Sequence, residues 1–251
     1  MEKNYYKEYY HLEREHWWFR ARGKILLTHL KRIFKGQPNI RILNIGAATG
    51  RSSELLMQLG DVTSLEFDKD CYEFSRDVIK IPIFQGSILD IEFQDNTFDL
   101  VCAFDVIEHV DDDKRAVSEM RRVCKQGGVM CVTVPAFMFL WSEHDVVNHH
   151  FRRYTSPILR GLFLGKDEPI FHTYFNFWLF FPIAVFRFLA KILPLKKKQT
   201  ADETASDFSV GKGNVLNRIL FGIFKSENVF LKRFIKLPVG VSLLSTWRKT
   251  I

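Results

Sequence analysis

The stretch Ile42-Leu-Asn-Ile-Gly-Ala-Ala-Thr-Gly50 decides the fold class. Its first half is a short β-rich run, its second half is a turn between two glycines, and the helix-like segment Ser52–Leu59 follows. A glycine turn between a strand and a helix brings the backbone close to a ligand and directs the helix N–H groups toward it. The spacing Gly-x-x-x-Gly is neither the dinucleotide fingerprint nor a P-loop, so neither of those sites is predicted.

Downstream of this turn, strand-like and helix-like segments alternate. We expect helices over Tyr72–Lys80 and over Asp112–Cys124, which Gly127-Gly128 should stop. The alternation predicts an α/β fold with a doubly wound, mostly parallel sheet, whose ligands bind beyond the carboxyl ends of the strands. Glu66 ends the second strand, where an acid can accept both hydroxyls of a ribose. The strand-like runs are Arg41–Ile45, Val62–Glu66, Ile81–Gln85, Phe98–Phe104, Val129–Val134, Pro169–Tyr174 and Val241–Trp247.

These segments resemble a class I S-adenosylmethionine-dependent methyltransferase over roughly residues 40–175 and the final strand. The resemblance implies a Rossmann-like, seven-stranded sheet with an antiparallel last strand, and S-adenosyl-L-methionine as cofactor. Besides the glycine turn it rests on Ser64-Leu-Glu-Phe-Asp68, Asn96-Thr-Phe-Asp-Leu-Val101, Asp105-Val-Ile-Glu-His-Val110, Met120-Arg-Arg-Val-Cys-Lys-Gln-Gly-Gly128 and Thr133-Val-Pro135. The cofactor-binding residues that it implies are Asn44, Gly46, Ala47, Ala48, Thr49, Gly50, Glu66, Phe67, Ser87, Ile88, Phe104 and Asp105.

Two positions depart from the family pattern. Asn44 and Ser87 stand where the family usually has Asp. Asn44 can still hydrogen-bond the turn but lacks the charge that helps to hold the cofactor's ammonium group, and Ser87 is a weaker acceptor than a carboxylate. These departures favour one alternative hypothesis, an inactive partner subunit that only binds the cofactor.

The flanking segments Glu15-His-Trp-Trp-Phe-Arg20 and Trp141–Tyr154 resemble a bacterial and archaeal group of these enzymes that often accompanies cell-envelope glycan or lipid pathways. Methyl transfer needs a base only when the acceptor is a hydroxyl or an ammonium group. We expect His150 and His144 to be catalytic, with a structural histidine as the alternative for His150. The predicted substrate-binding residues are Trp18, Phe19, His109 and Arg153; an ion pair with an acid is the alternative for Arg153.

No metal is predicted, and two segments offer alternatives. Asp105, Glu108 and His109 resemble the D/E-x-x-E-H segment of quinone O-methyltransferases, where a divalent ion can be held. The run from His144 to His150 also has a metal-like spacing.

The basic charge is concentrated in one part of the chain of 251 residues. The net charge is +7, and residues 161–251 contain 14 Lys and Arg against 6 Asp and Glu. Phe177–Lys198 is typical of an interfacial segment, because aromatic residues precede three lysines; its longest apolar run of ten residues is too short to span a bilayer, which needs about 20. The alternative is a lid over a substrate pocket. Motifs for base methylation are missing, so no nucleic acid is expected as partner.

We therefore expect three parts: an N-terminal helical cap (1–35), a methyltransferase core (36–175 and 240–251) and an aromatic, basic helical insertion (176–239). The predicted function is methyl transfer to an O or N atom of a small, lipid-like or lipid-linked acceptor. A soluble quinone- or polyketide-type O-methyltransferase is the alternative. The predicted partners are the small-molecule or lipid-like substrate and an anionic membrane surface, with the oligomeric state left open. Without a visible signal peptide, and with four cysteines of reduced character, the predicted localisation is cytoplasmic, peripheral on the inner face of the membrane.

Overall fold

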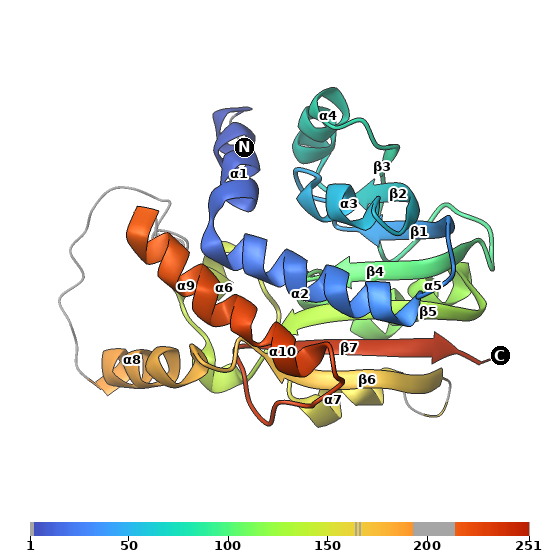
Figure 1. Cartoon of the computed structure of the whole chain (residues 1–251). Coiled ribbons are helices and arrows are strands. Elements are labelled where there is room, and N and C mark those ends of the chain that lie inside the picture. Colours follow the sequence, from blue (N-terminus) through green and yellow to red (C-terminus); the bar gives the residue numbers. More distant parts are fainter. Residues whose placement is uncertain (1–2, 164, 166, 193–213, 251) are drawn as a thin grey trace.

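The computed structural model describes residues 3–163, 165, 167–192 and 214–250. Their strands form one sheet in the order β3-β2-β1-β4-β5-β7-β6 (Figure 1). Strand β7 runs antiparallel to β5 and to β6, while the pairs among β1 to β5 are parallel. The predicted doubly wound sheet with an antiparallel last strand is confirmed. The strands are β1 (Ile40–Ile45), β2 (Gly60–Glu66), β3 (Ile83–Gln85), β4 (Phe98–Phe104), β5 (Cys124–Pro135), β6 (Asp167–Phe175) and β7 (Ser242–Lys249).

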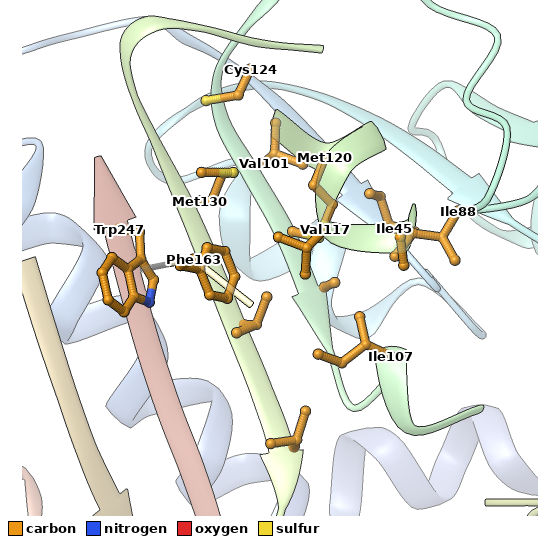
Figure 2. Packing of buried hydrophobic residues seen from close by; sticks show 14 of the residues in the cluster. Ile45, Ile88, Val101, Ile107, Val117, Met120, Cys124, Met130, Phe163 and Trp247 are labelled. Atoms are coloured by element: carbon orange, nitrogen blue, oxygen red, sulfur yellow. The ribbon is translucent and has the colours of Figure 1, made fainter. Parts of the chain in front are cut away.

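Helices cover both faces of the sheet, and this is why the central strands are apolar throughout. In β4, the four residues from Leu100 to Ala103 are fully buried. On one face, Val117 and Met120 of α5 join a core that reaches to Phe163 and Trp247, whose rings stack with centroids 5.2 Å apart (Figure 2). The helices are α1 (Lys3–Glu15), α2 (Trp17–Ile33), α3 (Arg51–Leu56), α4 (Lys69–Val78), α5 (Asp113–Val123), α6 (Glu143–Val147), α7 (Ser156–Gly161), α8 (Phe180–Ile192), α9 (Asn214–Ser226) and α10 (Asn228–Leu231), with 3-10 turns η1 (Ile107–His109) and η2 (Met138–Leu140).

The predicted helix over Asp112–Cys124 is confirmed to within one residue at each end, but the predicted helix stop at Gly127-Gly128 and the strand start at Val129 are wrong. Helix α5 ends at Val123, and β5 already begins at Cys124, so that both glycines lie inside the strand. Cys124 pairs with Phe98, and the register shifts before Leu100. Gly127 has a φ of +73°, which is the left-handed region that glycine adopts readily. The glycines therefore make an irregularity in the strand instead of stopping a helix.

Helices α8, α9 and α10 separate β6 from β7 along the chain. Helix α9 packs on α2, and the Asn217 side chain accepts a hydrogen bond of 2.6 Å from the N–H of Trp17. Both α8 and α9 lie near the end of the sheet toward which β4 and β5 point (Figure 1). None of the helices in the described ranges has both the length and the apolar character needed to cross a membrane. The lysines at 196–198, on which part of the interfacial prediction depends, lie outside the described residues.

Candidate active site

A cavity of about 520 Å³ lies beyond the carboxyl ends of the parallel strands. Its walls come from the turn after β1, the end of β4, the loop after β5 and the helices α1, α2, α8 and α9. Sequence-predicted residues from all three classes meet here: cofactor, substrate and catalytic. Those that line the cavity are Trp18, Phe19, Gly46, Ala48, Phe104, Asp105, His109, His144, His150 and Arg153.

The other predicted residues do not line this cavity. Asn44 lies below the turn and donates hydrogen bonds of 2.8 Å to the Ser52 and Ser53 hydroxyls. Ser87 accepts a hydrogen bond from the N–H of Leu89, and Ile88 belongs to the hydrophobic core (Figure 2). The remaining predicted cofactor-binding residues that do not line the cavity are Ala47, Thr49, Gly50, Glu66 and Phe67. The side chain of Phe67 is 75% exposed.

The glycine turn is hydrogen-bonded to β2 and also lines the cavity. The N–H groups of Gly46 and Ala47 donate to the Leu65 carbonyl at 2.8 and 3.2 Å. Gly46 has a φ of +67°, and a Cβ there would lie 2.5 Å from a methyl carbon of Val106, so the turn requires glycine. The turn can therefore bring its backbone close to a bound molecule.

Glu66 is held against this turn. Its carboxylate accepts hydrogen bonds from the N–H groups of Ala48 at 2.8 Å and Asp68 at 3.0 Å. Burial raises the pKa of Glu66, and those hydrogen bonds oppose the rise. This is the position at the end of β2 where the sequence predicts an acceptor for ribose hydroxyls.

Helix α1 covers the turn, a contact that the sequence did not indicate. Thr49 donates a hydrogen bond to the buried carboxylate of Glu13, and the Tyr6 hydroxyl donates to Asp68 at 2.7 Å. Burial raises the pKa of Glu13 to about 7, against the hydrogen bond from Thr49. The tyrosine periodicity predicts a helix here, but no local pattern says where that helix docks.

Arg22 of α2 is a further residue that the sequence analysis missed. Its guanidinium forms an ion pair of 2.5 Å with Asp105 and donates to the Thr133 hydroxyl at 3.1 Å. A signal was present, because Arg22 is a charged residue on the same face as Ile25 and Leu26, which are buried. The pair fixes the orientation of Asp105 at the cavity wall.

Asp145 organises the loop after β5. It is fully buried and accepts hydrogen bonds from His150 Nδ1 at 2.9 Å and from Arg153 Nε at 2.7 Å. Burial tends to raise the pKa of Asp145, but these hydrogen bonds hold it well below its usual range. Arg153 lines the cavity, yet its guanidinium is engaged by Asp145, which corresponds to the ion-pair alternative for this residue.

Glu108, His109 and His150 converge at the polar end of the cavity. One ligand-type atom from each lies within 4.8 Å of the others. Neither carboxylate oxygen of Glu108 has a hydrogen-bond partner among the described residues. Burial and the neighbouring His150 lower the pKa of His109 to about 4. The group differs from the metal alternative of the sequence analysis, because Asp105 pairs with Arg22 and His150 takes its place.

Comparison with known proteins finds a family match within the core. Residues 43–132 match the family described as a methyltransferase domain. The chain is 30% identical over 99 residues to a phosphatidylethanolamine N-methyltransferase of Cereibacter sphaeroides, covering 37% of this chain and 49% of the relative. It is 35% identical over 97 residues to a demethylmenaquinone methyltransferase of Renibacterium salmoninarum, covering 38% and 41%. The chain thus spans less than half the length of these two relatives.

A solved structure shares the fold over almost the whole chain. A putative methyltransferase from Bacillus halodurans C-125 superposes with a TM-score of 0.55 at 19% identity, covering 90% of this chain and 99% of that one. The likeness of fold therefore extends beyond the residues of the matched core.

Proposed function

We propose that this chain, which carries a class I S-adenosylmethionine-dependent methyltransferase domain, transfers a methyl group to an O or N atom of a small, lipid-like or lipid-linked acceptor. The observation that carries the proposal is the course of the cavity, which runs from the glycine turn to apolar side chains of α8. A cofactor at the turn and an apolar acceptor under α8 would then meet inside one cavity.

The residues at the turn fit the cofactor. Gly46 and Ala48 line the cavity, and a Cβ on Gly46 would clash with the Val106 side chain. Glu66 lies against this turn at the end of β2, where it would accept the two ribose hydroxyls. When bound, S-adenosyl-L-methionine supplies an activated methyl group on its sulfonium sulfur. The protein has to align the acceptor with that methyl group and keep water out. Helix α1 contributes to the second task by covering the turn.

The acceptor end of the cavity is apolar. It is lined by Trp18 and Phe19 of the N-terminal segment and by Leu179, Ile183 and Phe186 at the start of α8 and within it. Such a lining suits an acyl or isoprenoid chain better than a sugar or a nucleotide. Phosphatidylethanolamine and demethylmenaquinone, the acceptors in the names of the two relatives, are compounds of this kind.

Helix α8 is apolar on the side turned away from the cavity as well. Phe181, Val185 and Phe188 follow at helical spacing and are 52%, 58% and 63% exposed. Residues 176–239 contain eleven Lys and Arg and four Asp and Glu, a net +7. This charge would repel a second copy of the same segment and attract anionic headgroups. We therefore propose that α8 rests on an anionic membrane surface and delivers the acceptor from it.

The soluble quinone- or polyketide-type alternative would use α8 as a closed lid. Phe186 lines the cavity and is 67% exposed, so the cavity is open at α8, which favours access from a membrane. The inactive-subunit alternative rests on Asn44 and Ser87. The side-chain N–H groups of Asn44 donate to the hydroxyls of two serines, and the Ser87 hydroxyl accepts from the N–H of Leu89.

Two measurements test the proposal. Calorimetric titration with S-adenosyl-L-methionine should give saturable binding; no binding at millimolar concentration would contradict both enzyme hypotheses. Incubation with methyl-labelled cofactor and total membrane lipid should then place label in the organic phase. Label found only in water-soluble acceptors would favour the soluble alternative.

A further inference from the structure

We infer that the polar end of the cavity is a binding site for a primary ammonium group, formed by Glu108, His109 and His150. The inference deepens the proposed function and rests on it, because the ammonium group would belong to the methyl acceptor. It narrows the O or N atom of the proposal to the nitrogen of an amine carried on an apolar chain.

The first observation is the carboxylate of Glu108. It is fully buried at the cavity wall, and neither oxygen has a hydrogen-bond partner among the described residues. Burial favours the protonated form of this carboxyl, and a cation that enters the cavity would stabilise the ionised form by direct interaction. The two nearby guanidinium groups are already engaged, Arg22 by Asp105 and Arg153 by Asp145.

The second observation is the state of the two histidines. His150 Nδ1 lies 2.9 Å from the Asp145 carboxylate, so the ring carries its proton on Nδ1 and presents Nε2 as an acceptor. Burial keeps His109 neutral by lowering its pKa to about 4, and its ring hydrogen-bonds the backbone of Asn148. Each histidine therefore offers one nitrogen lone pair.

The number of acceptors matches an ammonium group. One ligand-type atom each of Glu108, His109 and His150 lies within 4.8 Å of the others. An ammonium group carries three N–H donors. A hydroxyl offers one donor and leaves Glu108 without a cation, and a phenolate would be repelled by that carboxylate. The apolar walls of the same cavity, with Trp18 and Phe186, accommodate the chain that bears the amine.

The site also supplies the base that an amine acceptor needs. An ammonium nitrogen has no lone pair until it gives a proton away, and His150 Nε2 can accept that proton while Asp145 stabilises the resulting imidazolium. The freed lone pair forms the new C–N bond. The C–S bond breaks with its electrons left on sulfur, and the product is a secondary ammonium with one more methyl group.

Titration calorimetry with octylamine and 1-octanol, on the full chain in buffer with EDTA and without cofactor, tests the inference. Octylamine should bind about tenfold more tightly than 1-octanol, since about 1.4 kcal/mol corresponds to tenfold and a hydrogen bond to a charged group contributes more than that. Glu108→Gln should remove the difference. The matched control, Glu143→Gln, changes an exposed acid of α6 and should retain it.

A second readout is independent of folding in the variant. Burial raises the pKa of Glu108 well above its usual value, with Asp105 adding to the rise, so a bound ammonium should ionise the carboxyl and release a proton. The proton appears as a dependence of the binding heat on the buffer. The titratable and charged groups that act on this carboxyl or lie beside it are Arg22, Asp105, His109, His150, Arg153 and Tyr154, and His144 acts on His109.

Three outcomes would overturn the inference. The first is equal affinity for octylamine and 1-octanol in the wild-type chain. The second is an unchanged preference in a folded Glu108→Gln chain. The third is Mn²⁺ or Zn²⁺ binding that depends on Glu108 while the EDTA-treated chain ignores octylamine, which would make this a metal site. The same sample is also titrated with S-adenosyl-L-methionine. If it binds the cofactor while one of these outcomes occurs, the ammonium site is contradicted and the proposed function is not.

Discussion

The carboxylate of Glu227 accepts a hydrogen bond of 2.7 Å from the backbone N–H of Asn176. The same carboxylate also accepts from the N–H groups of Phe177 and Trp178, at 2.7 and 3.2 Å. Glu227 is fully buried, and burial raises its pKa to about 7 against these hydrogen bonds. One side chain between α9 and α10 thus fixes the chain as it leaves β6 for α8.

Replacement of this anchor should loosen α8. Glu227→Ala leaves three N–H groups without their acceptor, of which that of Asn176 is buried, so we expect the free energy of unfolding to fall by roughly 2–4 kcal/mol in urea titrations. Limited proteolysis should cut within α8 sooner. Ser226→Ala, at the exposed neighbour, should stay within about 0.5 kcal/mol. Equal effects of the two substitutions would contradict the assigned role.

Glu13 should make stability depend on pH. Its pKa is about 7 in the folded chain, above the value of an unfolded glutamate, so the folded state favours the protonated form. The free energy of unfolding should therefore decrease as pH rises from about 4.5 to 7, by on the order of 3 kcal/mol from this group. In Glu13→Gln that part of the slope should vanish in urea titrations across this range. An unchanged slope would show that Glu13 is not buried against the glycine turn.

Asp145 should matter more than an exposed acid in a comparable ion pair. Asp145→Asn leaves Arg153 buried without its charge partner, and we expect a loss of about 3–5 kcal/mol. Asp111→Asn, in an exposed pair with Arg152, should change stability by less than about 1 kcal/mol. In the Asp145 variant, ¹⁵N NMR should also report a changed tautomer of His150. If the tautomer stays, Asp145 does not orient that ring.

Phe188 should contribute to membrane binding. Phe188→Asp removes an exposed phenyl ring from α8, and burial of such a ring is worth about 1.5–3 kcal/mol, so flotation with anionic vesicles should recover roughly ten- to a hundredfold less protein. Phe84→Asp is the control, because Phe84 is 49% exposed on β3, at the opposite edge of the sheet from β6. Equal binding by both variants would exclude α8 as the contact.

Glu66 should determine the affinity for the cofactor. Glu66→Gln replaces a carboxylate acceptor with a neutral one, and the weaker hydrogen bonds to the ribose hydroxyls should raise the Kd for S-adenosyl-L-methionine about ten- to a hundredfold. Calorimetry on Glu73→Gln, an exposed acid of α4, should give the wild-type value. A wild-type Kd in the Glu66 variant would place the ribose elsewhere.

The sequence predicted what depends on neighbouring residues. Apolar runs such as Phe98–Phe104 predicted the strands, and the glycine turn predicted the class of sheet. Both predictions depend on residues that are neighbours in the sequence, which determine the local backbone conformation. The sequence did not predict the contacts between distant segments. Glu13 meets Thr49 and Arg22 meets Asp105 only after the N-terminal helices dock, and periodicity carries no information about the docking site. Ile88 was assigned to the adenine site, but its side chain fills the core, where its apolar character is needed.

The position of β7 has a consequence for how the chain is made. Strand β7 pairs with β5 on one side and with β6 on the other, so β6 has no partner in the described sheet until residues 242–249 arrive. A ribosome therefore produces β6 and the Phe-rich segment after it well before the strand that fastens them. During that interval the aromatic side chains of the insertion are exposed near the ribosome, where a membrane or a chaperone can bind them before β7 is made.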